Sequence, residues 1–241
     1  MAPKVVFFDA AGTLFNPREP IGESYARIAR RHGVDADADA VAAGFRRAFH
    51  SAGGLAFGPG RPPAELRRLE RDWWREVVRK TFAGLGSFAD FNAYFDELFR
   101  HFSDAANWRA DPEAAPLLES LKRAGLRLGL ISNFDFRVSA ILDGLGLARY
   151  FDSITISSEA GWAKPAAELF AAALARHRAS PGQSAHVGDA PDLDVAGAEA
   201  AGLAAILIDP AAPSRLAVAG RNARVAALSV VSEALEKMPF P

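Results

Sequence analysis

Polar side chains that can bind ions or act as nucleophiles follow four short apolar segments of the chain. The first segment, VVFF at 5–8, leads directly into Asp9 and then into a loop opened by Gly12 and Thr13. The other three are followed by Ser132 and Asn133, by Lys164, and by Asp189 with Asp194. Carboxylates beside a lysine and a hydroxyl are typical of a site for Mg²⁺ and phosphate, because Mg²⁺ takes oxygen ligands while lysine and hydroxyl groups hold phosphate oxygens. An aspartate in such a site can be the nucleophile and form an aspartyl-phosphate.

Each of these residues also has an ordinary structural role open to it. Short polar side chains commonly end strands and begin helices, and charged ones commonly face solvent. The individual alternatives are a turn at Asp9, helix caps at Ser132, Asn133 and Asp189, and solvated side chains at Lys164 and Asp194.

The elements around these residues favour the functional interpretation. A short continuous run such as VVFF is typical of a strand buried on both faces. From about residue 110, short apolar runs alternate with helical patterns, which predicts a parallel sheet with helices on both faces. Polar residues beyond the carboxyl ends of such strands converge at one edge, where ligands bind. The predicted strands are 4–8, 126–132, 153–157, 184–189 and 203–209, and the predicted later helices are 112–125, 138–142, 165–177 and 191–201.

Residues 17 to about 107 show helical periodicity without a predicted strand. Four amphipathic stretches begin near Ile21, after the DADADA turn at 35–40, at Pro62 and after Ser87. Such helices can bury their apolar faces against one another in a bundle. Their aromatic stripes are predicted to be core, with Trp74 or Phe57 as alternative substrate-lining residues.

The predicted fold class is therefore α/β. A Rossmann-like parallel-sheet core at 1–16 and 108–241 is interrupted by an inserted all-helical domain at 17–107.

Composition excludes several classes of function. Half of the 241 residues are hydrophobic and the net charge is −1, so neither disorder nor a general affinity for nucleic acid is indicated. With no cysteine there is no disulfide, thiolate metal site or thiol nucleophile. The N-terminus lacks the pattern of a signal peptide, and no apolar run approaches the ~20 residues of a membrane span. We expect a soluble, cytoplasmic protein without nucleic-acid or membrane partners, as a monomer or a homodimer.

The order of the motifs DxxGTLF, SN, KP and GDxxxxD resembles the haloacid dehalogenase-like hydrolase superfamily. The finer pattern, FDAAGTLF, RDWWR, SSEAGWAKP and VGDAPDLDVAGAEAAG, is similar to the helical-cap subfamily that includes proteins like the rhythmically expressed gene 2 product. The resemblance extends over the whole chain, because the helical insertion lies where that family places its cap.

The resemblance implies a role for each motif residue. Asp9 would be the nucleophile and a metal ligand, and Ser132 and Lys164 would hold the phosphate. Asp189 would be a direct Mg²⁺ ligand and Asp194 would act on the metal mainly through water. Thr13 and Asn133 would orient or hydrogen-bond nearby groups.

The chain departs from the family pattern at Ala11. Phosphatases of the family have an aspartate there as general acid and base, while the metal ligand from that position is a backbone carbonyl, which Ala11 keeps. A missing acid and base costs roughly 10²- to 10⁴-fold in rate. Water or another acid could substitute, and the candidates are Asp135, Asp192 and His50.

We predict a magnesium-dependent phosphatase acting on a small phosphate ester. A haloacid dehalogenase tolerates a non-acid at position 11. However, it needs no metal, so the presence of both Asp189 and Asp194 argues against it. A phosphonoacetaldehyde hydrolase also has Ala there but needs a cap lysine, and the only cap lysine, Lys80, is expected to be solvated. A binding or regulatory protein that has lost turnover is the alternative from a different class.

Overall fold

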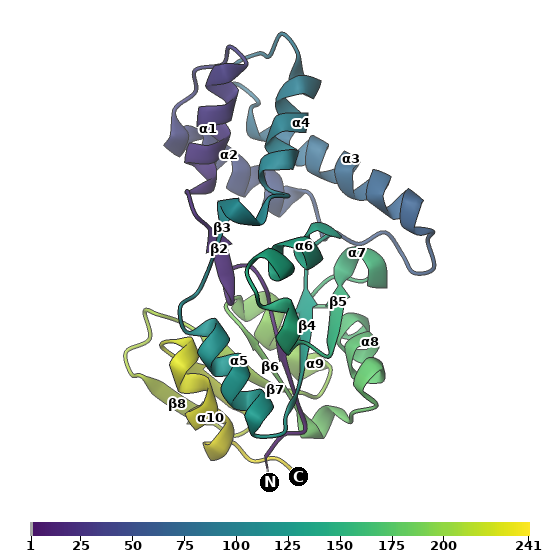
Figure 1. Cartoon of the computed structure of the whole chain (residues 1–241), viewed down its shortest axis with the longest axis vertical. Helices are drawn as coiled ribbons and strands as arrows, with labels where there is room; N and C mark the ends of the chain where they lie inside the picture. The colour runs from purple at the N-terminus through teal and green to yellow at the C-terminus, as the bar shows by residue number, and fades with distance from the viewer. Residues whose placement is uncertain (1) are drawn as a thin grey trace.

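The computed structural model describes residues 2–241 and has two lobes, an α/β core and a helical cap (Figure 1). Within the described residues the core contains a seven-stranded sheet that is parallel except at one edge, where β8 runs antiparallel to β9. The strand order is β5 (Ser153–Ile156), β4 (Arg127–Ser132), β1 (Val5–Phe8), β6 (Ser184–Gly188), β7 (Ala204–Ile208), β9 (Asn222–Val225) and β8 (Leu216–Ala219).

Strand β1 lies inside the sheet and is buried on both faces, as its sequence predicts. It pairs in parallel with β4 and β6, so that Phe8 lies opposite Leu130 and Val187. Alternate side chains enter different layers: Val6 and Phe8 pack with α5 and α10, whereas Val5 and Phe7 pack with α8. The alternation places successive side chains on opposite faces of the sheet. The parallel pairing with β4 and β6 sets the level at which β1 ends.

Helices cover both faces of the core sheet. The predicted helix at 191–201 is divided into a π-helical turn at Pro191–Val195 and a short α-helix, and the helix predicted from Pro165 begins two residues later. The core helices are α5 (Ala114–Arg123), α6 (Arg137–Gly144), α7 (Ser157–Ala160), α8 (Ala167–His177), α9 (Ala196–Ala200) and α10 (Val231–Lys237). Single 3₁₀ turns lie at Ala105–Asn107, Ala148–Tyr150, Pro181–Gln183 and Leu228–Val230.

The cap consists of the four helices that the sequence indicates. They are α1 (Ile21–Arg31), α2 (Ala38–Ser51), α3 (Pro63–Thr81) and α4 (Phe91–His101). Asp37 and Asp90 cap α2 and α4 by accepting hydrogen bonds from backbone N–H groups at 2.9 and 3.0 Å, which sets where both helices begin. Their apolar faces form a separate hydrophobic core around Tyr94 and Phe95.

Two short strands join the cap to the core. Strand β2 (Phe15–Pro17) leads into the cap and pairs antiparallel with β3 (Trp108–Ala110), which leads out of it. The Phe15 and Trp108 rings meet edge to face at 5.4 Å. Both chain crossings therefore lie side by side in one ribbon. No helix in the described part of the chain is long and apolar enough to cross a membrane.

Candidate active site

Asp9 stands at the carboxyl end of β1, at the edge that the sequence predicts. Its backbone N–H donates to the carbonyl of Val187 at 2.9 Å, which continues the β1–β6 ladder into the residue. The side chain is buried, with 6% of the residue exposed. A buried carboxylate needs a compensating charge.

Lys164 supplies that charge. Its Nζ donates to Asp9 Oδ1 and to Asp194 Oδ1, both at 2.6 Å, and the residue is buried. Burial alone would lower the pKa of the Lys164 ammonium, but the carboxylates of Asp9 and Asp194 outweigh it and raise the pKa above its ordinary value. Lys164 is therefore a fixed cation beside the predicted nucleophile.

Asn133 positions the segment that carries Lys164. Its Oδ1 accepts from the Lys164 backbone N–H at 2.7 Å and its Nδ2 donates to the Lys164 carbonyl at 3.1 Å. Ser132, at the end of β4, is buried and lines the same cavity as Asp9. The segments after β4 and β5 are thus brought to the end of β1.

The two aspartates after β6 complete an acidic cluster. One oxygen each of Asp9, Asp189 and Asp194 lies within 4.8 Å of the others. Thr13 Oγ1 donates to Asp189 Oδ1 at 3.0 Å, and partial burial followed by the charge of Asp9 raises the pKa of Asp189. Three carboxylates at this spacing offer the oxygen ligands that Mg²⁺ prefers, so these residues can hold the metal.

Asp194 differs from Asp189 in its hydrogen bonds. Its Oδ1 accepts from Lys164 and from His186 Nε2 at 2.8 Å, and its Oδ2 accepts from the Ala190 N–H at 3.0 Å. Burial opposes ionisation, but Lys164 and His186 more than offset it, so the pKa of Asp194 is well below its ordinary value. Because its oxygens are already engaged, contact with a metal through water suits this residue.

Two glycines make room for the carboxylates. A Cβ on Gly12 would lie 2.5 Å from Asp189 Oδ2, and one on Gly188 would lie 2.2 Å from Asp194 Cγ. Gly12 also has φ +96°, in the region that other residues rarely adopt. Glycine is therefore required at both positions, because a side chain there would collide with the neighbouring carboxylate.

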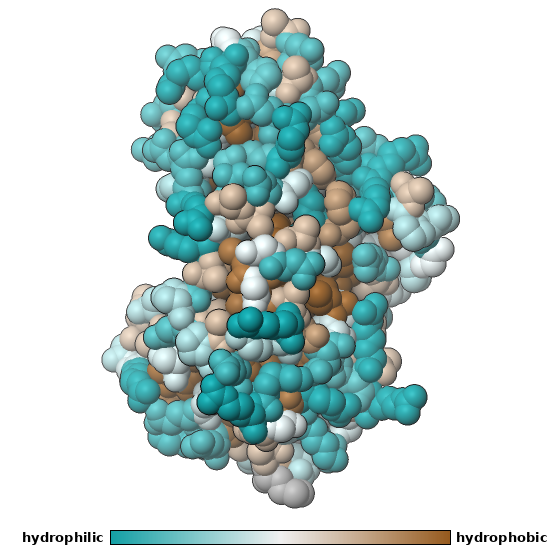
Figure 2. Space-filling view, viewed as in Figure 1, coloured by the Kyte–Doolittle hydropathy of each residue, from teal (hydrophilic) through white to brown (hydrophobic). Residues whose placement is uncertain are grey.

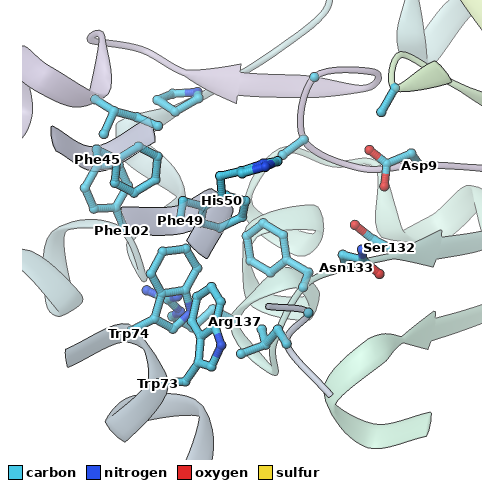
Figure 3. Close-up of a pocket in the computed structure, with 18 of the residues that line it drawn as sticks. Asp9, Phe45, Phe49, His50, Trp73, Trp74, Phe102, Ser132, Asn133 and Arg137 are labelled. Carbon is cyan, nitrogen blue, oxygen red and sulfur yellow. The ribbon is translucent and has the colours of Figure 1, made fainter. Parts of the chain in front are cut away.

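Ala11 lines the cavity, at the position where phosphatases of the family have an aspartate. Of the three candidate substitutes, Asp135 is fully buried in an ion pair with Arg137, and Asp192 lies on an exposed turn outside the cavity lining. His50 does line the cavity, at the end of α2 (Figure 3). Lys80 is exposed, lies 3.6 Å from Glu76 and is outside the lining, in agreement with the expectation that it is solvated.

Other contributing residues were not predicted as part of the site. His186, fully buried on β6, binds Asp194, and the only signal for it is a polar residue within the apolar run SAHVG. Phe49 was predicted to be core, but 43% of the residue is exposed and it lines the cavity, because α2 ends above the site. Trp74 lines the cavity, as one alternative proposed, while Phe57 does not.

The cavity has a volume of about 670 Å³ and extends from Asp9 into the space between core and cap. Hydrophobic residues gather on the surface between the core and the cap (Figure 2). Figure 3 shows Phe45, Phe49, Trp73 and Trp74 on the cap side, with Asp9 and Ser132 on the core side. A ligand bound at Asp9 would contact both lobes.

The structure is thus a capped α/β core with an acidic cluster at the carboxyl ends of its strands. The model of the haloacid dehalogenase-like hydrolase family matches residues 3–202, and the chain belongs to this family. Among curated proteins, it is 35% identical over 213 residues to haloacid dehalogenase-like hydrolase domain-containing protein 3 of Homo sapiens, covering 85% of this chain and 81% of that protein. It is 31% identical over 217 residues to ribulose-1,5-bisphosphate 5-phosphatase of Halopiger xanaduensis, covering 87% and 86% of the two chains.

Solved structures share the whole architecture. The L-2-haloacid dehalogenase of Xanthobacter autotrophicus superposes with a TM-score of 0.74 at 19% identity, covering 98% of this chain and 100% of that one. Core and cap are thus shared between this chain and that structure. Because one scaffold carries both dehalogenation and phosphate ester hydrolysis, the reaction has to be inferred from the site.

Proposed function

We propose that the protein is a magnesium-dependent phosphatase that hydrolyses a small phosphate monoester through an aspartyl-phosphate. The observation that carries this proposal is the acidic cluster of Asp9, Asp189 and Asp194 around a buried lysine. A dehalogenase nucleophile needs no metal-binding carboxylates, whereas a phosphatase uses a cation to bring two anions together. The likeness to a curated bisphosphate phosphatase supports the same reaction class.

The chain's own residues would divide the chemistry between them. Asp9 attacks phosphorus and the bond to the ester oxygen breaks; water then attacks phosphorus of the aspartyl-phosphate, which releases inorganic phosphate and restores Asp9. Lys164 and Ser132 hold the phosphoryl oxygens, and Asn133 keeps the Lys164 segment in place. Mg²⁺, held by Asp9, Asp189, the Ala11 carbonyl and, through water, Asp194, would supply positive charge that offsets the repulsion between nucleophile and phosphate.

Ala11 limits which esters react quickly. Without a carboxyl group at this position the leaving oxygen departs unprotonated, or takes a proton from water or from His50, which lines the cavity. Esters with acidic leaving groups therefore lose less than the roughly 10²- to 10⁴-fold contribution of a general acid and base.

A Schiff-base mechanism of the phosphonoacetaldehyde hydrolase kind has less support. It requires a lysine from the cap in the cavity, and Lys80 faces solvent instead.

The test is phosphate release from a panel of phosphate esters with Mg²⁺ and with a chelator, alongside halide release from 2-haloacids. We expect phosphate release that requires Mg²⁺ and is abolished in Asp9→Asn, which keeps the shape of the side chain but removes its charge and nucleophilicity. Metal-independent halide release would favour a dehalogenase instead. No turnover of either kind by the folded protein would favour the binding class.

A further inference from the structure

The cavity is much larger than a phosphate group requires. Its volume of about 670 Å³ falls within the range of roughly 300–1,000 Å³ for pockets that enclose a whole small molecule. Asp9 and Ser132 lie at the core end, away from the cap rings (Figure 3). The remainder of the cavity is available for the leaving group.

Aromatic rings from the cap form the wall opposite Asp9 (Figure 3). Trp73 and Trp74 meet edge to face with centroids 4.9 Å apart, and Phe49 lies 5.6 Å and 5.9 Å from them. Phe45 stacks on Phe49 at 5.5 Å. Although these rings contact one another, Phe49 remains 43% exposed and lines the cavity, so apolar surface is open to a ligand.

The same wall offers little to a second anionic group. Among the described residues that line the cavity, the cations outside the catalytic end are Arg137 and, when protonated, His50. Arg137 is buried, and its guanidinium donates to Asp135 at 2.9 and 2.6 Å while lying 4.1 Å from the centroid of the Phe99 ring. Its charge is therefore already compensated within the protein.

We propose that the substrate is an aryl phosphate monoester whose leaving group is an uncharged aromatic ring system. This inference rests on the proposed phosphatase function and specifies its substrate class. Aromatic walls favour flat apolar groups through edge and face contacts. Apart from His50, the described lining outside the catalytic end offers no uncompensated cation, which disfavours a second phosphate or carboxylate.

The missing acid at Ala11 agrees with this class independently of the cavity. A phenolic oxygen ionises near pH ~10, against about 15.7 for water, which an alcohol resembles. In the first step Asp9 bonds to phosphorus and the aryl oxygen leaves with the electron pair as an aryloxide, which takes a proton from water. Water then hydrolyses the aspartyl-phosphate, so the balance is aryl phosphate plus water to phenol plus inorganic phosphate.

The test compares phosphates whose leaving groups have similar acidity but different size and charge. We expect kcat/KM for 2-naphthyl phosphate to exceed that for phenyl phosphate by at least about tenfold, because even one methylene in an apolar pocket is worth roughly 10- to 200-fold. Phenyl phosphate bearing a carboxylate on the ring should react more slowly than phenyl phosphate. Equal kcat/KM for naphthyl and phenyl phosphate, or preference for the carboxylate, would overturn the inference while leaving the phosphatase function intact.

Variants locate the preference in the cap wall. Phe49→Ala should reduce the naphthyl-to-phenyl ratio severalfold, whereas Phe91→Ala, which removes a cap ring outside the cavity, should leave it unchanged. An equal reduction of the naphthyl-to-phenyl ratio in both variants would contradict the assignment of the preference to the cap wall.

A binding measurement separates the two proposals. Quenching of tryptophan fluorescence by 2-naphthyl phosphate in Asp9→Asn reports occupation of the cavity without turnover. Naphthyl binding that exceeds phenyl binding in this variant, together with a wild type that hydrolyses no ester, would support the ligand class and refute the phosphatase function. No preference in binding or in turnover would refute the ligand class.

Discussion

Replacement of Trp74 by Phe should make opening of the cap more frequent without unfolding either lobe. Trp74 lies on α3 of the cap, and its indole Nε1 donates to Asp135 Oδ2 of the core at 2.6 Å. Asp135 is fully buried and keeps its two bonds to the Arg137 guanidinium when Trp74 is changed. The variant therefore loses one bond between the lobes while the buried ion pair stays compensated.

The magnitude follows from the charge of the acceptor. A hydrogen bond to a charged group contributes about 1.5–3 kcal/mol, and since 1.4 kcal/mol is about tenfold, cap opening should become about 10- to 100-fold more frequent. Phe136 reports this opening, because its backbone N–H donates to Glu70 of the cap at 3.3 Å. Hydrogen exchange of 133–137 should accelerate accordingly, while exchange of strand β4 stays unchanged.

Trp73→Phe is the matched control. The Trp73 indole nitrogen is buried without a hydrogen-bond partner, so the same loss of ring size removes no bond between the lobes. Equal acceleration of exchange in Trp73→Phe and Trp74→Phe would show that ring volume matters rather than the bond to Asp135. No acceleration in Trp74→Phe would refute the reasoning.

Three further predictions concern single residues. Ala11→Asp should raise kcat/KM for alkyl phosphates more than for aryl phosphates, by up to about 10²- to 10⁴-fold; no gain with any ester in a folded variant would mean that something other than the missing acid limits turnover. Gly188→Ala should weaken Mg²⁺ binding in calorimetry by about 10- to 100-fold, because its Cβ would displace Asp194; unchanged affinity would contradict this. Burial, and then the charge of Asp135, raise the pKa of the Glu70 carboxyl group above its ordinary 4.5. The folded state therefore holds this proton more tightly than the unfolded state does. The free energy of unfolding consequently falls as pH rises from about 4.5 through the raised pKa. Glu70→Gln should remove this slope in urea unfolding, making the variant more stable relative to the wild type at pH 8 than at pH 5, and parallel curves for the two proteins would count against it.

The sequence was sufficient to predict the α/β core, the helical insertion and the sheet edge. Runs such as VVFF and LRLGLIS are buried strands because they are apolar throughout, and their polar ends meet because parallel strands share a direction. Strands β8 and β9 were missed. LAVA at 216–219 is apolar but only four residues long and lies largely exposed at the sheet edge, while NARV at 222–225 is a short strand with two polar residues, so neither stands out as a buried strand.

The cavity could not be predicted because its walls come from separate lobes. Periodicity indicates that Phe49 lies on the apolar face of its helix, but not that the helix ends above Asp9 and leaves the ring exposed. For the same reason Asp135 was considered as an acid. Its sequence neighbours do not reveal the bond from Trp74, 61 positions away.

Trp74 connects the proposed recognition of the leaving group with closure of the cap. Trp74 lines the cavity and also donates the bond that holds the cap to Asp135. A ring that fills the aromatic wall therefore adds contacts to a cap that is already closed over Asp9, and closure excludes water from the ionic cluster. In the proposed phosphatase, exclusion of water would strengthen the interactions of Lys164 with phosphoryl oxygens, so a substrate with a large aromatic leaving group would gain in phosphoryl transfer as well as in binding. A small ester that leaves the wall uncovered would lack this gain, which is why selectivity in this molecule is expected in kcat as well as in KM.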